Sequence, residues 1–412
     1  MNMELRPILS SLRRHRITAW LLILEIALTC AIVCNAVFLI HQRLQRMDIP
    51  SGIAEHELLQ IQFAYIGDRP DAYAQTQTDL ATLRQIAGVQ AVALANQLPL
   101  SGYAMSNSGL KLHPRQRQNT IEAASYYGQN LLATLGVRLV SGRDFQPDEL
   151  LDLKTVMPAL HSDDMKNLPH TVIITEAVAT RLWPGQNALG KTIYVGDDIP
   201  LQVVGVSAPL ARPDHLQMGA QYSVVFPIRL TATEGGSYVI RTALQDRGQV
   251  LKAALAALRR LDPDRIVLEQ RTYDELRHGF FENDRAMAGM LAGVIAALLV
   301  VTALGIAGLA SFWVGQRYRT IGVRRALGAT RGDILRYFQT ENFLLATFGI
   351  AAGMLLAYGI NLFLMMHYEL PRLPGMYLPV GALTLWAVGQ LAVLGSALRA
   401  SQVPPVAAMR SA

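Results

Sequence analysis

AMAGMLAGVIAALLVVTALGIAGLASFWV, residues 286–314, is an apolar run without a single charged side chain. A helix needs about 20 apolar residues, at about 1.5 Å of rise per residue, to cross a hydrocarbon core of about 30 Å. Residues 286–314 exceed that length, and so do three further apolar stretches at 17–40, 343–366 and 378–398. The sequence therefore predicts an α-helical membrane protein with four transmembrane helices.

The overall composition agrees with this prediction. Hydrophobic residues make up 51% of the 412 residues and charged residues 17%, against roughly 25% charged in an average soluble domain. This composition excludes a disordered or fibrous chain and argues against a purely soluble one.

Residues 17–40 follow a basic tail, as in a signal peptide, but their length exceeds the usual apolar region of a signal peptide and no small-x-small cleavage site follows. We interpret this stretch as a retained anchor.

Basic side chains are concentrated in the short segments that flank the predicted spans. Residues 1–16, 315–342 and 399–412 together carry 12 Lys or Arg and 3 Asp or Glu, whereas residues 41–285 carry 24 and 26. Short loops rich in Lys and Arg stay in the cytoplasm. We therefore expect both termini and the 315–342 loop to be cytoplasmic and residues 41–285 to lie outside. The net charge of +6 then orients the protein in the membrane, and we expect no nucleic-acid partner.

The 41–285 segment has strand and helix patterns typical of a large α+β extracytoplasmic domain. Apolar residues alternate in 57–65, a helical pattern covers about 71–86, and an apolar run follows at 89–95. The same strand–helix–strand order returns at 237–270. These patterns predict two βαβ units with a β-rich module inserted between them at about 120–230. The strands expected in this module lie at 171–174, 192–195 and 201–206.

Residues 185–192 read GQNALGKT, a literal match to the phosphate-binding loop G-x-x-x-x-G-K-T. A working loop of this kind follows a buried strand and opens a helix, whose amides hold the phosphates. Here the order is reversed, because a helical pattern at 176–183 precedes the match and a strand pattern at 191–195 follows it. We interpret the segment as a β-turn rather than a nucleotide site.

Other motifs for chemistry are missing from the sequence. It contains no G-x-S-x-G elbow, no H-E-x-x-H and no C-x-x-C motif. His161, Asp163 and Asp164 lie in a polar segment without spaced partners, which favours a solvated loop over a cation site. We therefore expect that the chain is not an enzyme and holds no metal or cofactor.

Polar and small residues inside the predicted spans favour contacts between helices. Glu25 lies mid-span, where a carboxylate facing lipid is costly, so we expect it to face another helix or a second subunit. A polar contact within the helix bundle is favoured over a proton-relay role. Cys30 and Cys34 lie one turn apart with no His nearby, which favours packing over metal binding. The G-x-x-x-G pairs at 289–293 and 349–353 would allow close helix approach, although such pairs also arise by chance, and both interpretations stay open.

The 319–338 segment, RTIGVRRALGATRGDILRYF, predicts a short helix, a break at Gly328 and a new helix. Thr330 is placed as the N-cap residue of the new helix and Asp333 as its third residue, a variant of the capping box. A capped, Arg-rich helical elbow outside the bilayer is suited to docking on another protein. The alternative interpretation is that its charge only sets the topology.

The chain resembles the FtsX/MacB-type ABC transporter permeases. Residues 321–335 are similar to the family's EIGxRRALGA loop, and residues 397–410 to its RAxxxxPxxALR ending. The predicted outer domain resembles the MacB-like periplasmic core at 135–145, 174–192 and 203–206. Two departures stand out: Thr320 occupies a position where the family usually has Glu, and residues 150–170 form a longer stretch than is usual.

The resemblance implies a permease of the bacterial inner membrane, working as a homodimer or heterodimer with a separate ABC ATPase that binds the ATP. Such a permease couples ATP hydrolysis to movement of its periplasmic domain for export or efflux, by mechanotransmission. The alternative is a signalling mechanotransmitter that regulates a periplasmic partner such as a cell-wall hydrolase. A periplasmic adaptor is a further partner in either case.

The resemblance also assigns domains and site residues. The expected domains are a cytoplasmic tail (1–16), transmembrane helix 1 (17–40), a MacB-like periplasmic core domain (41–285), transmembrane helix 2 (286–314), a coupling elbow (315–342), transmembrane helices 3 (343–366) and 4 (378–398) and a cytoplasmic tail (399–412), with 286–412 forming the FtsX-like permease domain. The residues expected to couple to the ATPase are Ile321, Gly322, Arg324, Arg325, Ala326, Leu327, Gly328, Ala329, Thr330 and Asp333.

Overall fold

The computed structural model describes residues 16–65, 69–102, 104–160, 162, 165–196, 198–214, 219–368 and 372–401. The predictions for His161, Asp163 and Asp164, and for most of the two terminal tails, lie outside these residues. The chain divides into two compact units. We call Met1–Met47 with Asn283–Ala412 the helical unit, and Asp48–Glu282 the sheet unit.

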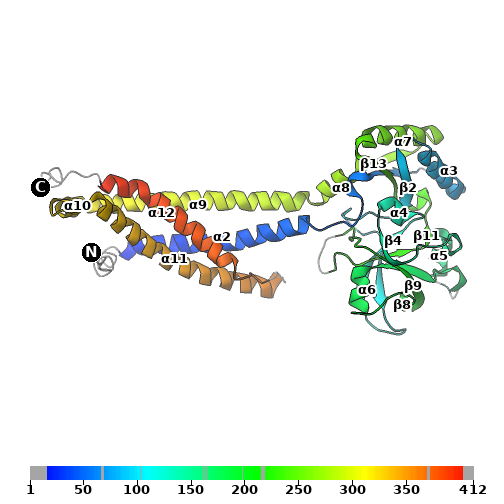
Figure 1. The fold of residues 1–412 in the computed structure, drawn as a ribbon, viewed down its shortest axis with the longest axis horizontal. Helices are drawn as coiled ribbons and strands as arrows, with labels where there is room; N and C mark the ends of the chain where they lie inside the picture. Colours follow the sequence, from blue (N-terminus) through cyan, green and yellow to red (C-terminus); the bar gives the residue numbers. More distant parts are fainter. Residues whose placement is uncertain are drawn as a thin grey trace. The chain divides into compact units, whose positions relative to one another are not determined.

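Four helices of the helical unit are long and apolar enough to cross a membrane, as predicted. Each extends beyond its apolar run, because the flanking polar residues are also good helix formers. The residues after the first predicted span, for example, continue the same helix to Met47. The long helices are α2 (Arg16–Met47), α9 (Glu282–Gln316), α11 (Arg331–Tyr368) and α12 (Tyr377–Ser401), and a short helix, α10 (Tyr318–Ala326), lies between α9 and α11 (Figure 1).

Helices α2 and α11 approach each other closely at one of the two glycine pairs. A Cβ atom on Gly349 would lie 2.8 Å from the Cβ of Ile26, and one on Gly353 would lie 2.5 Å from the Cβ of Cys30. Real side chains do not approach so closely, so only glycine permits this packing. The 349–353 pair is therefore a helix contact. In the part of the chain that the structure describes, no atom outside their own stretch of helix lies within 4 Å of a Cβ placed on Gly289 or Gly293.

The polar residues of the first helix face its neighbours. The Glu25 carboxylate lies against Gly305 of α9, where an added Cβ would be 2.6 Å from Oε1. One turn further on, Thr29 shares a hydrogen bond of 2.9 Å with Thr302. Cys30 and Cys34 are completely buried in the packed core. The predictions that Glu25 faces another helix and that the cysteines pack are confirmed.

The sheet unit contains a four-stranded sheet built from both of its ends. Its strand order is β13-β1-β12-β2 and every pairing is antiparallel. Each end of the sheet unit supplies a strand, a helix and a strand. The two strands from one end are separated in the sheet by a strand from the other end. The elements are β1 (Leu58–Ala64), α3 (Ala72–Arg84) and β2 (Val89–Ala95), then β12 (Ser237–Thr242), α7 (Arg247–Leu261) and β13 (Ile266–Thr272).

The alternating pattern of β1 explains how this sheet packs. Leu59, Ile61 and Phe63 point to one face and form a core with buried residues of α3 and α7, among them Leu83 and Leu258. Residues on the opposite face, such as Leu58, pack in a different core together with the inserted module. Both faces of β1 are therefore covered, which agrees with its almost continuous burial.

The inserted module is a mixed sheet that closes on itself. Its strand order is β5-β9-β7-β10-β4-β3-β8, and β8 pairs with β9 as well as with β3. Six strands therefore form a closed barrel, in the order β9, β7, β10, β4, β3 and β8, with β8 paired back to β9. A closed barrel leaves its strands without a free edge. The predicted strands at 171–174, 192–195 and 201–206 are present as β7, β8 and β9. The strands are β3 (Asn107–Lys111), β4 (Ile121–Tyr127), β5 (Leu139–Gly142), β7 (Thr171–Thr175), β8 (Thr192–Val195), β9 (Ile199–Ser207) and β10 (Ser223–Phe226).

Smaller elements complete the sheet unit. Two short strands pair in parallel beside the barrel, and helix α8 starts with a full capping box between Thr272 and Glu275. The remaining elements are α4 (Leu131–Leu135), β6 (Leu151–Asp152), α5 (Leu153–Ala159), α6 (Glu176–Leu182), β11 (Ile228–Arg229) and α8 (Tyr273–Phe280).

Candidate functional site

The predicted elbow consists of α10, a tight turn and the start of α11. Helix α10 ends with hydrogen bonds from the Ala329 amide to the Arg324 carbonyl (3.1 Å) and from the Gly328 amide to the Arg325 carbonyl (3.1 Å). This pair of bonds defines a Schellman motif, which requires a left-handed residue. Gly328 supplies it with φ of +100°. The predicted glycine break is confirmed.

The new helix begins with the predicted capping arrangement. The Asp333 amide donates to the Thr330 hydroxyl (3.2 Å), and the Thr330 amide donates to the Asp333 carboxylate (3.0 Å). The Thr330 hydroxyl also donates to the same carboxylate, at 2.7 Å. Two backbone amides that the helix leaves free are satisfied in this way, so the direction of the turn is fixed by local side chains.

One side of the elbow is anchored in the core of the helical unit. Ile321 on α10 is buried and packs in the same cluster as Ile334 and Phe338 on the first turns of α11. Gly322 is buried beside Ile321. These contacts join the short helix to the long ones.

The arginines of the elbow have partners within the chain that the sequence did not reveal. The Arg324 guanidinium lies over the ring of Tyr337, 4.9 Å from its centroid. Arg325 donates through Nη1 to the carbonyl of Ser401, at 2.9 Å. Ser401 is the last residue of α12, so a cation there satisfies a free carbonyl and interacts well with the helix dipole. Arg325 therefore ties the elbow to α12.

An ion pair connects the junction between α9 and α10 to α11. Arg317 donates to Glu341 of α11 through both terminal nitrogens, at 2.8 and 3.1 Å. Glu341 is only 1% exposed, and bidentate pairs of this kind have a fixed geometry. Neither residue was among the predicted site residues, because their 24-residue separation carries no local signal.

The remaining predicted site residues form the exposed side of the elbow. Leu327 is 83% exposed at the tip of the turn. Ala326, Gly328, Thr330 and Asp333 are exposed beside it, and Ala329 is half-buried. The ten predicted residues thus divide into an anchored side and an exposed side, with an unpaired apolar side chain at the tip.

The G-x-x-x-x-G-K-T match has the helix–turn–strand order that the sequence predicted. It lies between α6 and β8, and Gly185 and Gly190 have φ values of +69° and +78°. Lys191 donates to Gln186 and lies over the Trp183 ring, 5.1 Å from its centroid. The lysine thus interacts with the turn itself. Among the described residues, no group of three or more His, Cys, Asp or Glu side chains could hold a metal ion.

Comparison with protein families gives two matches that together span most of the chain. Residues 22–261 match the model of the MacB-like periplasmic core domain. Residues 292–405 match the model of the FtsX-like permease C-terminal domain.

Two of the relatives that it matches are longer than this chain. The macrolide export ATP-binding/permease protein MacB of Chromobacterium violaceum is 28% identical over 57% of the chain and 34% of its own length. The pyoverdine export ATP-binding/permease protein PvdT of Pseudomonas aeruginosa is 29% identical over 66% of the chain and 42% of its own length. The chain therefore spans less than half the length of these two curated relatives. The solved periplasmic region of MacB from Actinobacillus actinomycetemcomitans aligns with 55% of the chain and 94% of its own, at 16% identity and a TM-score of 0.34.

Proposed function

The chain belongs to the family of ABC transporter permeases that combine a MacB-like periplasmic core domain with an FtsX-like permease C-terminal domain, and we propose from this premise that it is the permease subunit of an export system. It lies in the bacterial inner membrane with both termini in the cytoplasm. A separate ABC ATPase binds the ATP, and the elbow receives its movement. The export in the names of the two relatives supports transport over pure signalling.

The observation that carries this proposal is the construction of the elbow. Its tip presents Leu327, 83% exposed, on a turn whose geometry is fixed by Gly328 and by the Thr330–Asp333 cap. A single exposed leucine is common on protein surfaces, so the proposal rests on its position at the tip of a turn whose backbone is fixed on both sides. In the proposal, Leu327 inserts into an apolar groove of the ATPase.

The anchored side of the elbow supports its role in coupling. A displacement of the tip would pass to α11 through Arg317–Glu341 and to α12 through Arg325–Ser401. Transmission of this kind shifts the population of two arrangements and involves no chemistry in this chain. The arginines thus act inside the elbow, and the apolar tip rather than Arg325 supplies the main contact with the ATPase.

Replacement of Leu327 by aspartate is expected to weaken ATPase binding at least tenfold. Residues that anchor an interface in a pocket contribute about 2 kcal/mol or more, and about 1.4 kcal/mol corresponds to a factor of ten. The measurement is the affinity of the purified permease for its ATPase in nanodiscs, together with stimulation of ATP hydrolysis. Leu244→Asp is the matched control, because Leu244 is 56% exposed on the sheet unit.

Equal binding by the Leu327→Asp variant and the Leu244→Asp control would contradict the docking role of the elbow. A variant that loses the ATPase, in cells whose export is unchanged but whose wall hydrolysis is altered, would favour the signalling alternative. Export that fails together with ATPase binding supports the proposed function.

The proposed topology is tested by single cysteines in a chain that carries Cys30→Ala and Cys34→Ala. Ala74→Cys on α3 is expected to react with a membrane-impermeant maleimide in intact spheroplasts, whereas Leu327→Cys reacts only after the membrane is opened. Both positions are exposed within their own units, so accessibility differs only through the membrane. The reverse labelling pattern would invert the orientation.

A further inference from the structure

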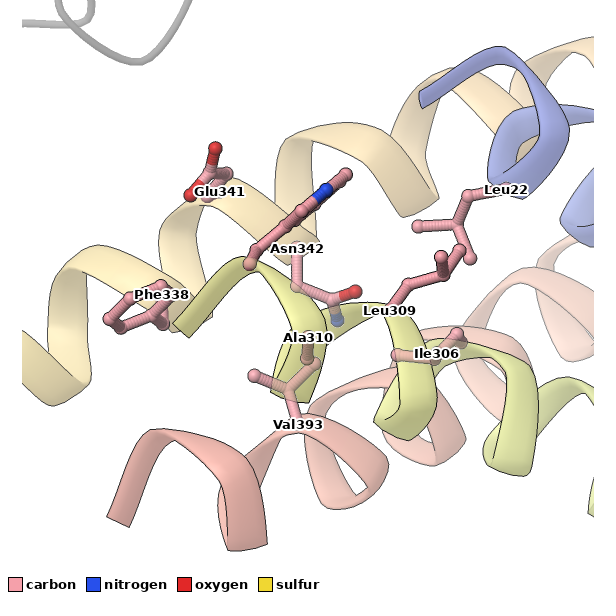
Figure 2. Close-up of a pocket in the computed structure, with 9 residues that line it drawn as sticks. Leu22, Ile306, Leu309, Ala310, Phe338, Glu341, Asn342 and Val393 are labelled. Atoms are coloured by element: carbon pink, nitrogen blue, oxygen red, sulfur yellow. The ribbon is translucent and has the colours of Figure 1, made fainter. Parts of the chain in front are cut away.

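A small cavity lies where α9 meets the other three long helices. Its space for the centre of a water molecule is about 10 Å³, and Figure 2 shows its lining. Apolar side chains from α2, α9 and α12 form most of the wall, and the Asn342 side chain extends from α11 towards Ala310 of α9 (Figure 2). The apolar residues of the wall include Leu22, Ile306, Leu309, Ala310 and Val393.

Two of the residues that line this cavity each carry a hydrogen-bond donor without an acceptor. The indole Nε1 of Trp313 and the amide Nδ2 of Asn342 are both buried, and within the described part of the chain neither has a hydrogen-bond partner. Each side chain is only 5% exposed. Buried donors in native proteins are nearly always satisfied, by protein or by ordered water. Two such donors at one cavity therefore point to an occupant that accepts hydrogen bonds.

The size and chemistry of the cavity determine the occupant. A single water needs roughly 10–15 Å³ of such space and at least two polar partners, and the cavity provides about 10 Å³ and two N–H groups. An indole N–H can only donate, so the occupant must offer lone pairs. We propose that one buried water molecule occupies this cavity and accepts hydrogen bonds from Trp313 Nε1 and Asn342 Nδ2.

This water joins α9 to α11 close to the ion pair between Arg317 and Glu341. Trp313 lies on α9 one turn before Arg317, which directly follows that helix, and Asn342 directly follows Glu341 on α11. The end of α9 thus meets α11 through a water bridge and the neighbouring ion pair, whereas α2 and α11 meet through glycines in direct contact. Water adapts to small displacements of its partners more readily than interlocked side chains do, so the α9–α11 joint is the adjustable one.

The direct test is NMR of the full chain in nanodiscs with ¹⁵N-labelled tryptophan. The Trp313 indole signal is assigned by its loss in Trp313→Phe. We expect cross-relaxation between this indole proton and water protons, and loss of that contact in Asn342→Leu. Absence of a water contact at Trp313 in the unmodified protein would overturn the proposal, whatever the variants do.

Thermal unfolding provides a second readout whose sign differs between a filled and an empty cavity. With water bound, Asn342→Leu leaves the water and Trp313 unpaired, so the Tm falls by about 2–4 °C, the shift expected for one ordinary hydrogen bond. In an empty cavity, the same change removes an unsatisfied amide, so the Tm is unchanged or rises. An unchanged or raised Tm therefore counts against the bound water.

A matched tryptophan calibrates this readout. Trp386 on α12 donates directly to the Thr347 hydroxyl at 3.2 Å, so Trp386→Phe measures the loss of an ordinary indole bond. Trp313→Phe is expected to lower the Tm by a similar amount, and to add little in a chain that already carries Asn342→Leu. Additive effects of the two changes would contradict a shared water.

Discussion

Replacement of Asp79 by alanine is expected to lower the free energy of unfolding of the sheet unit by about 3–5 kcal/mol. Asp79 on α3 accepts from Arg265 at 2.7 Å, and both side chains are 0% exposed. The Tyr238 hydroxyl donates to the other carboxylate oxygen at 2.6 Å, and burial raises the pKa of Tyr238, so this donor stays protonated. Without Asp79 the Arg265 charge stays buried without its main counter-ion.

Urea unfolding of the full chain, followed by the fluorescence of Trp183, measures this effect, because Trp183 is the tryptophan of the sheet unit. The control is the pair Asp79→Leu with Arg265→Met, which removes both charges. Replacing both partners of a buried ion pair with apolar side chains is often neutral or stabilising. A cost below about 1 kcal/mol for Asp79→Ala alone would show that Arg265 is satisfied elsewhere.

Replacement of Glu341 by alanine is expected to destabilise the helical unit by a similar amount, about 3–5 kcal/mol, and to uncouple the elbow. The change leaves the Arg317 guanidinium, whose side chain is 18% exposed, without the carboxylate that it contacts through two nitrogens. The start of α10 then loses its ionic connection to α11. We expect stimulation of the ATPase to fall at least tenfold while the ATPase still binds through Leu327.

Thermal unfolding and ATPase stimulation of the reconstituted complex measure the two effects separately. Arg143→Gln is the matched control, since Arg143 also contacts a carboxylate, that of Glu149, through two nitrogens but is 44% exposed on the sheet unit; exposed ion pairs contribute only about 0–1 kcal/mol. The double change Arg317→Met with Glu341→Met is expected to restore stability. Full stimulation by the Glu341→Ala variant would show that this ion pair has no part in coupling.

Local chemistry explains why the elbow could be predicted from the sequence in some respects and not in others. Gly328, Thr330 and Asp333 interact within a few residues of one another, so their spacing alone predicted the turn and the cap. The partners of Arg317 and Arg325 lie 24 and 76 residues away in the chain, and they became visible only once the helices were packed. The composition indicated a basic loop, but it could not show whether its arginines form contacts within the chain or a surface that binds a partner.

The sheet unit shows the same limit. Strands 171–174, 192–195 and 201–206 were evident from their apolar runs, but a strand carries no mark of its partner. The closure of the barrel depends on β8 pairing with both β3 and β9, and β3 is more than 75 residues away in the chain. In the four-stranded sheet, the order of elements was readable, whereas the insertion of β12 between β1 and β2 required the structure.

The pairing of β1 with β13 has a mechanical consequence. Because the two strands are antiparallel and Leu59 is opposite Thr272, the segments that lead along the chain to α2 and α9 leave the sheet at the same end. A force that pulls these two segments apart would break the backbone hydrogen bonds between β1 and β13 one pair after another, starting at that end. A force that pulls both segments in the same direction would not act on these hydrogen bonds. Two side-chain contacts connect the segments at that end and hold them together: Arg277 with Glu55 (2.6 Å) and His56 with Asp274 (2.9 Å). Separation of the two strands from this end therefore has to break the Arg277–Glu55 ion pair and the His56–Asp274 hydrogen bond before it reaches the first backbone pair of the sheet.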